Sequence, residues 1–318
     1  MPSPDEYQHL FPEPLKPRSK GVSLLFIGTN SLLFRDSKTA IFVDPYFTRP
    51  GPILGLQYFL KTVAPNQQII HKALDRIGIA KANAVLLTHT HIDHALDAPD
   101  VAKLTGAKIF GSRSAVNVGK GGGVPEDFLC EVEIGKPYKI GTFRVTFFES
   151  EHLPFPKIVE PLINYKEEID EPLVPPVRMA EFREGGTFKI LIEHKLGSFL
   201  VSGGGLDTNP PPISATAISI TIAGLALRSK EYREKLFRKS VIDTGAHRVF
   251  LTHWDDFGKP LDEPPDFLGR AHLVVDHFIE MAKSSEVELF LPPLWSETLL
   301  FPQGKRGIFQ KIRDLFRR

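Results

Sequence analysis

The stretch Leu86-Leu87-Thr88-His89-Thr90-His91-Ile92-Asp93-His94 places three imidazoles and one carboxylate within six residues, directly after the apolar, strand-like run Ala82–Leu87. Imidazole nitrogen and carboxylate oxygen suit divalent metals such as zinc. At the mouth of a strand, His89 and His91 are two residues apart and can converge on one ion. If the chain then turns into a helix, Asp93 and His94 point towards a second ion. The spacing therefore predicts the paired-ion centre of a hydrolase, in which the ions lie about 3.5–4 Å apart.

A single histidine is more often an ordinary packed or surface residue than a metal ligand. The chain, however, has 11 histidines in 318 residues. Three at the fixed positions of one window would then arise by chance roughly 0.01 times along such a chain, before the aspartate is required. The metal interpretation is therefore favoured.

Three further segments follow the order of a known family, and with them the chain resembles the metallo-β-lactamase superfamily of metal-dependent hydrolases. The segment 41–44 resembles its first motif, in which Asp44 orients the metal loop without binding metal. His152 follows the strand-like run 144–148 and matches the third ligand of the first ion. His253 lies in the segment 249–257, which resembles the last motif. The likeness runs from about residue 21 to 293. The segments 244–248 and 253–257 make it closest to the ascorbate-6-phosphate lactonase-like branch, which also resembles the N-acyl phosphatidylethanolamine phospholipase-like hydrolases.

The resemblance implies a division of the ligands between two ions. The first ion would be held by His89, His91 and His152, and the second by Asp93, His94 and His253. Asp93 would also be the catalytic residue that orients the nucleophile or passes on its proton. The expected cofactor is zinc, two ions per chain, with manganese or iron as alternatives. Because ligating imidazoles need an acceptor for their second N–H group, supporting roles are expected for Asp44, Trp254, Asp255 and Asp256.

One departure concerns the aspartate that usually bridges both ions in this family. Here the matching segment reads Ser202-Gly203-Gly204-Gly205-Leu206-Asp207, and the strand register puts Gly204 at the bridging place. Three glycines make a loop flexible enough to bring Asp207 back to the metals. Otherwise Asp207 is a turn residue beside Asn209-Pro210. The register favours the second interpretation, in which replacing Asp207 would leave the second ion unaffected.

Hydrophobic periodicity and turn residues indicate an α/β fold. Short apolar strands are predicted at 23–29, 31–35, 39–44 and 82–87, then at 107–111, 189–194, 198–202, 218–223 and 248–253, with 287–291 as the last core strand. Helices are predicted at 67–77, 95–104, 230–243 and 271–283. Hairpins mixed with βαβ crossovers suit the αββα sandwich of the family, two mixed β-sheets with outer helices. Residues 1–20 are Pro-rich and polar, and are expected to form an arm rather than a core element, followed by a hydrolase domain over 21–301.

Composition narrows the class of protein. The net charge of +1 gives no reason to expect nucleic acid as a partner, and Cys130 is the only cysteine. One cysteine cannot form an intramolecular disulfide, which fits a reducing compartment. The first residues lack the pattern of a secretory signal, and no apolar run approaches the ~20 residues needed to span a bilayer. A cytoplasmic protein is therefore expected.

Two segments are expected to contact a substrate or a surface. Residues 153–186 hold six prolines, carry four acids clustered within 167–171, start beside His152, and are expected to form a substrate lid. Residues 51–58 could form the opposite, apolar wall. Residues 302–318 have the stripe of a basic amphipathic helix, which either packs on a protein surface or makes peripheral contact with an anionic membrane. The oligomeric state is open.

The expected function is a metal-dependent hydrolase that uses a metal-activated hydroxide on an ester, lactone or phosphorylated small molecule. Two alternatives remain. One is a phospholipid phosphodiesterase at the membrane surface. The other is a catalytically weak binding protein that retains the fold.

Overall fold

The structure is a computed structural model that describes residues 2–16, 19–52, 56–153, 167–202, 205–207 and 212–303. Its centre is a pair of β-sheets, each of seven strands within the described residues. In spatial order the first sheet contains β16 (Ser296–Pro302), β1 (Gly21–Gly28), β2 (Ser31–Arg35), β3 (Ala40–Val43), β5 (Ala84–Leu86), β6 (Lys108–Gly111) and β7 (Leu129–Glu131). The second contains β15 (Glu288–Phe290), β14 (Arg248–Thr252), β13 (Ala217–Thr221), β12 (Gly197–Ser202), β11 (Thr187–His194), β9 (Phe143–Ser150) and β8 (Pro137–Ile140).

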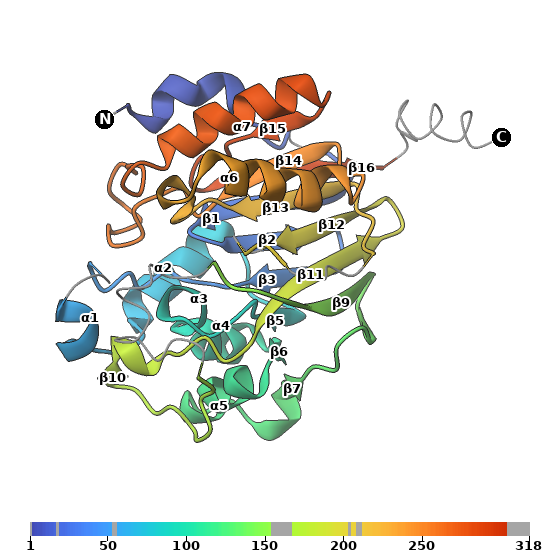
Figure 1. The fold of residues 1–318 in the computed structure, drawn as a ribbon. Helices are drawn as coiled ribbons and strands as arrows, with labels where there is room; N and C mark the ends of the chain where they lie inside the picture. The colour runs from blue at the N-terminus through green and yellow to red at the C-terminus, as the bar shows by residue number, and fades with distance from the viewer. Residues whose placement is uncertain are drawn as a thin grey trace.

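Helices cover both outer faces of this pair of sheets. The α-helices are α1 (Leu56–Leu60), α2 (Gln67–Ile77), α3 (Ile92–Ala95), α4 (Ala98–Thr105), α5 (Arg113–Gly121), α6 (Lys230–Phe237) and α7 (His272–Ser284). The strands lie between α6 and α7 on one side and α2, α4 and α5 on the other (Figure 1). The predicted αββα sandwich of two mixed sheets is therefore confirmed.

Alternating side chains of the first sheet divide the core into two. In β1, Leu24 and Phe26 face the second sheet and share one buried cluster with Phe147 of β9. Leu25 and Ile27, one residue out of phase, belong to the cluster that the helices cover. Successive side chains of a strand point to opposite faces, so a strand buried on both faces is apolar throughout.

Helix α2 illustrates how local sequence sets an element. The Asn66 side chain accepts a hydrogen bond from the backbone N–H of Ile69, which caps the N-terminus. Residues 70, 73, 74 and 77 form its buried face, at the spacing of one helical stripe. Gly78 ends the helix with φ +69°, in the left-handed region that glycine favours. The predicted helix over 67–77 is confirmed. The helix predicted at 95–104 corresponds to α4, which begins at Ala98 because the separate short helix α3 ends at Ala95.

Two predictions about the chain ends are wrong. Residues 287–291 do not form the last strand, because β16 follows and pairs antiparallel with β1 in the first sheet. The N-terminal arm is not merely a lead-in, because it contains the 3₁₀ helix η1 (Pro4–Leu10), whose Tyr7 is buried. The Tyr7 hydroxyl donates to Asp276 Oδ1 of α7 at 2.8 Å, and its ring meets Phe267 edge-on at 5.5 Å between centroids.

The described part of the predicted lid, residues 167–186, is anchored rather than loose. It contains β10 (Val177–Arg178), which pairs with β4 (Thr62–Val63), and the 3₁₀ helix η4 (Met179–Glu181). Met179 and Phe182 are fully buried. Asn117 of α5 donates its side-chain N–H to the Ile169 carbonyl at 2.7 Å. The rest of the predicted lid lies outside the described residues, as do residues 53–55 of the predicted apolar wall and residues 304–318 of the predicted C-terminal helix.

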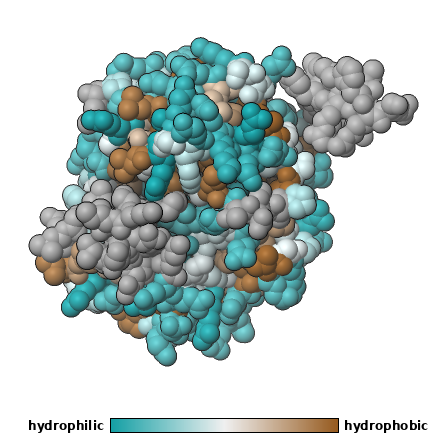
Figure 2. All heavy atoms as spheres, in the orientation of Figure 1, coloured by the Kyte–Doolittle hydropathy of each residue, from teal (hydrophilic) through white to brown (hydrophobic). Residues whose placement is uncertain are grey.

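The surface is mostly hydrophilic on the face drawn in Figure 2, where hydrophobic residues form separate small groups. Among the described residues, no helix has the length and apolar character needed to cross a membrane.

Candidate metal centre

Three strand ends, those of β5, β9 and β14, deliver the predicted ligands to one edge of the two sheets. His89 and His91 follow β5, and α3 begins directly after His91, so that Asp93 and His94 lie on its single turn. This is the turn from strand into helix that the spacing predicts. His152 lies two residues beyond β9, and His253 follows β14 directly. All six residues therefore come from segments that leave the carboxyl ends of their strands.

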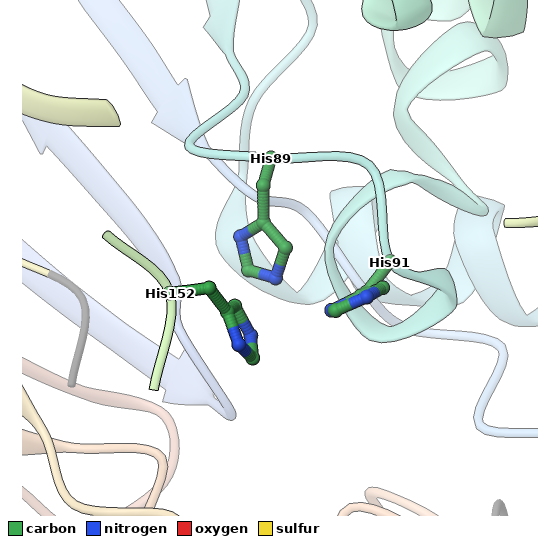
Figure 3. A group of neighbouring side chains, drawn as sticks. All are labelled: His89, His91 and His152. Atoms are coloured by element: carbon green, nitrogen blue, oxygen red, sulfur yellow. The ribbon is translucent and has the colours of Figure 1, made fainter. Parts of the chain in front are cut away.

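His89, His91 and His152 form the first group. Their ring centroids are 4.7 Å apart for His89 and His91, 5.0 Å for His89 and His152, and 4.8 Å for His91 and His152. Each offers a ring nitrogen within 4.8 Å of the nitrogens of the other two. Figure 3 shows the rings of His89 and His91, on one loop, converging with the ring of His152 from a separate segment. This is the set that the resemblance assigns to the first ion.

Asp93, His94 and His253 form the second group. The Asp93 Oδ2 atom lies 2.9 Å from His253 Nε2 and 3.6 Å from His94 Nε2. The two groups are neighbours, because the rings of His89 and His94 are 3.9 Å apart between centroids. The structure thus brings together every residue that the sequence predicts as a ligand, in the predicted division of three and three.

Fixed contacts to Nδ1 direct the other nitrogen of three rings into the centre. His94 Nδ1 lies 2.8 Å from Asp44 Oδ2, and His152 Nδ1 donates to the Leu153 carbonyl at 2.8 Å. His89 Nδ1 lies 3.1 Å from the Thr88 hydroxyl. Such contacts set the tautomer and orientation of ligating imidazoles. Two buried ring nitrogens, His89 Nε2 and His253 Nδ1, have no hydrogen-bond partner among the described residues.

Asp44 supports the metal loop without belonging to either group. Its backbone is left-handed, with φ +43°. Its carboxylate accepts the Thr88 backbone N–H at 2.8 Å and the Asn30 side-chain N–H at 2.7 Å, in addition to its contact with His94. One carboxylate therefore fixes both the start of the metal loop and the ring of one candidate ligand, which is the role that the resemblance implies.

Burial and neighbouring charge set the protonation of the site. Burial lowers the pKa of His89 well below its usual value, and the neighbouring histidines lower it further. Burial also lowers the pKa of His152 to about 4. For His94, burial opposes the charged form, but the carboxylates of Asp93 and Asp44 raise its pKa. Burial likewise opposes ionisation of Asp93, but His94 and His253 lower its pKa. At neutral pH, His89 and His152 therefore present lone pairs and Asp93 a negative charge.

The residues after His253 have different roles. Trp254 is fully buried and donates its ring N–H to the Pro292 carbonyl at 3.1 Å, so it packs in the core. Asp256 accepts the Gly258 backbone N–H at 3.0 Å and closes a turn. The Phe257 ring meets the His253 ring at 4.8 Å between centroids. Among the described residues, none of these three side chains accepts an N–H from a candidate ligand ring. Asp255 is the one residue of this segment whose carboxylate supports the site, and it does so through other residues.

Asp255 acts on His253 through the backbone. It forms a buried ion pair with Arg49 at 2.7 Å and accepts the Thr29 backbone N–H at 2.7 Å. The Thr29 carbonyl in turn accepts the backbone N–H of His253 at 2.6 Å. Thr29, Arg49 and His253 all have positive φ, which costs free energy in non-glycine residues and persists where the surroundings impose it. No local pattern in the sequence indicates the role of Arg49.

Asp207 belongs to neither group. Its side chain is buried in an ion pair with Lys189 of β11. The expected turn beside Asn209-Pro210 lies outside the described residues. The role of Lys189 was not predicted, although a lysine inside the apolar run Phe188–Ile192 indicates a buried charge that needs a partner.

Comparisons with known proteins agree with this architecture. The family model of the metallo-β-lactamase superfamily matches residues 25–199. A UPF0173 protein of Pyrococcus furiosus is 26% identical over 41% of this chain and 50% of its own length. A UPF0173 metal-dependent hydrolase of Pyrobaculum arsenaticum is 28% identical over 38% of this chain and 45% of its own length. The chain thus spans about half the length of the curated relatives it matches.

Solved structures with low sequence identity share the fold. Igni18, a metallo hydrolase of Ignicoccus hospitalis, has a TM-score of 0.55 at 14% identity, over 87% of this chain and 97% of that one. CmlA, a diiron β-hydroxylase of Streptomyces venezuelae, has a TM-score of 0.54 at 14% identity, over 90% of this chain and 55% of that one. With the family model matching more than half of its residues, the chain belongs to the metallo-β-lactamase superfamily.

Proposed function

We propose that the protein is a metal-dependent hydrolase with two ions per chain. The first ion is held by His89, His91 and His152, and the second by Asp93, His94 and His253. The observation that carries the proposal is the convergence of these six side chains into two adjacent groups at one sheet edge. Zinc is the expected metal, because five imidazoles and one carboxylate suit a borderline-soft ion.

The residues present fit such ions. His89 Nε2 and His253 Nδ1 are buried without a hydrogen-bond partner among the described residues, which is costly unless something binds them. The low pKa values of His89 and His152 keep both rings in the neutral form that binds metal. The CmlA neighbour is a diiron protein, so iron must be tested beside zinc and manganese.

When bound, such ions polarise the substrate and lower the pKa of a coordinated water towards ~7. The chain supplies the rest of the chemistry. Asp93, ionised and in contact with His253, orients the nucleophile and accepts or passes on its proton. Asp44 holds His94 in place, and the Thr29 carbonyl holds the backbone of His253.

The substrate class follows from this chemistry only in outline. A polarised carbonyl or phosphoryl centre with a leaving oxygen fits an ester, a lactone or a phosphorylated small molecule, with small lactones and phosphorylated metabolites preferred. The closer likeness to ascorbate-6-phosphate lactonase-like enzymes stays a prediction. So does membrane contact through the C-terminal segment, which lies outside the described residues.

The test is hydrolysis of a panel of lactones, phosphodiesters and phosphomonoesters by protein loaded with zinc, manganese or iron.

His89→Ala or His91→Ala should remove the first ion and abolish hydrolysis, whereas His253→Ala should mainly deplete the second ion. His277→Ala is the matched control, because this buried histidine of α7 lies outside both groups. If His89→Ala keeps full metal content and activity, the assignment is wrong. If the metal-loaded protein hydrolyses none of these compounds, the alternative of a catalytically weak binding protein that retains the fold is favoured.

A further inference from the structure

The Asp207 carboxylate makes three contacts at the end of β9. Its Oδ1 atom accepts the Ser150 hydroxyl at 2.7 Å and the Glu151 backbone N–H at 3.0 Å. Its Oδ2 atom pairs with Lys189 Nζ. Asp207 thus binds the two residues that immediately precede His152, one of the three candidate ligands of the first ion.

The Lys189–Asp207 pair is buried, with only 6% of each residue exposed. Lys189 lies on β11, opposite Phe148 of β9, so the pair joins the two strands behind the site. Two opposite buried charges in direct contact stabilise each other, and removing one leaves the other without a counter-charge. The ammonium of Lys189 therefore holds the carboxylate of Asp207 in place.

The backbone before Asp207 also packs closely on the segment that contains His152. A Cβ atom added to Gly205 would lie 1.6 Å from the Glu151 carbonyl oxygen and 3.1 Å from the carbonyl carbon of His152. Only glycine allows two backbones to approach so closely. The segment 205–207 is therefore a backing for residues 150–152.

We propose that Asp207 is a positioning residue for His152, fixed by Lys189, and that it does not bridge the two ions. The inference rests on the proposed function, because it concerns the geometry of the first metal site. Reaching the ions would take the carboxylate away from Ser150, from the Glu151 N–H and from Lys189, leaving a buried ammonium without a counter-charge. That cost opposes the movement.

The proposal predicts different effects on the two ions. His152 belongs only to the first group, so loss of Asp207 should weaken the first ion and spare the second. A bridging carboxylate would behave differently, since its loss would deplete the second ion as fully as Asp93→Ala does.

The experiment is a competition titration of the metal-free full chain with zinc and a chelator, which gives an affinity for each ion. Cobalt(II) absorption provides a second readout of ligand geometry. We expect Asp207→Ala to lower the affinity of the first ion about 10–100-fold, the usual effect of losing a partner that orients a ligand, and to alter the cobalt spectrum. The second ion should keep its affinity within about threefold.

Two further variants keep the test independent of folding. Asp207→Asn retains an oxygen for the Glu151 N–H but leaves Lys189 unpaired. The double variant Lys189→Met/Asp207→Asn removes both charges and should recover most of the first-ion affinity. Asp36→Ala is the matched control, because Asp36 also accepts two backbone N–H groups and a hydroxyl, at the opposite end of the β2–β3 hairpin from Asp44. It should leave both affinities unchanged.

The outcomes are distinct. Loss of the second ion in Asp207→Ala, or unchanged affinity for both ions, would overturn the inference while the wild type still binds two ions. A wild type that binds no metal would overturn the proposed function, and this inference with it.

Discussion

Asp44 shows how a carboxylate can direct a candidate metal ligand without belonging to either group of candidate ligands. It receives the Thr88 N–H and contacts Nδ1 of His94, so the ring can offer only Nε2 to the second group. Motif position predicted this role, because a short strand ending in aspartate recurs in the family. The contact between the Thr88 hydroxyl and His89 was not predicted, although a hydroxyl one residue before a ligand is well placed to meet its ring.

Asp97 gives a prediction for pH dependence. Its fully buried carboxyl accepts the backbone N–H groups of Phe47 and Thr48 at 2.6 and 2.7 Å. Burial raises its pKa from 3.8 to about 6, with a further rise from Asp100. Between these pH values the folded state binds more protons than the unfolded state. Stability from this group is therefore greatest below pH 3.8 and falls as pH rises through 6, by about 3 kcal/mol in all.

Urea denaturation of the metal-free protein can isolate this contribution. Asp97→Asn lacks the ionisable group, so the difference in unfolding free energy between wild type and Asp97→Asn should shrink by about 3 kcal/mol between pH 4 and pH 7. A difference that stays constant over this range would show that Asp97 titrates normally.

At the scale of elements, the sequence predicts best what is local. The strand before His89, the turn into α3 and the helix ended by Gly106 are all encoded within a few residues. The hairpin of β11 and β12 is similarly local. By contrast, the Lys189–Asp207 and Arg49–Asp255 pairs join residues that are 18 and 206 positions apart, and no periodicity reports such pairing.

Gly28 tests the Arg49–Asp255 connection between elements. It has φ +126°, and an added Cβ would lie 2.2 Å from Arg49 Nη2 and 2.9 Å from Asp255 Oδ2. Gly28→Ala should therefore separate the buried pair and lower the unfolding free energy by about 3–5 kcal/mol. Because Asp255 supports His253 through Thr29, the second ion should lose more affinity than the first.

The control for this variant is Gly78→Ala at the end of α2, where φ is +69° and a Cβ would meet nothing within 4 Å. It should lose only the cost of the left-handed backbone, about 1 kcal/mol, as measured by the same urea denaturation. Equal losses in the two variants would argue against a role for the ion pair.

At the scale of the whole molecule, the fold class was predictable because buried strands and amphipathic helices alternate in a readable order. The contacts that the two chain ends make with the rest of the fold were not predictable in this way. β16 lies beyond the strand at 287–291 that was expected to be the last, and it pairs with β1 at the other end of the chain. Tyr7 stands in a polar, Pro-rich segment, and only the tertiary structure shows that it completes the core beside α7.

Tyr7 gives a prediction for this closure. Tyr7→Ala removes a buried ring and should lower the unfolding free energy by about 3–5 kcal/mol. Tyr7→Phe removes only the hydrogen bond to Asp276 and should cost about 1 kcal/mol. Both are measured by urea denaturation. Wild-type stability in Tyr7→Ala would mean that the arm does not contribute to the core.

The central claim is the paired metal centre, and the most direct measurement is the number of ions that the full chain binds. Metal-free protein titrated with zinc, with the bound metal determined by elemental analysis, should take up two ions per chain. Two ions are expected because the five imidazoles and one carboxylate form two adjacent groups, each with three candidate ligands. A stoichiometry of one ion or none, with zinc, manganese and iron alike, would contradict the account.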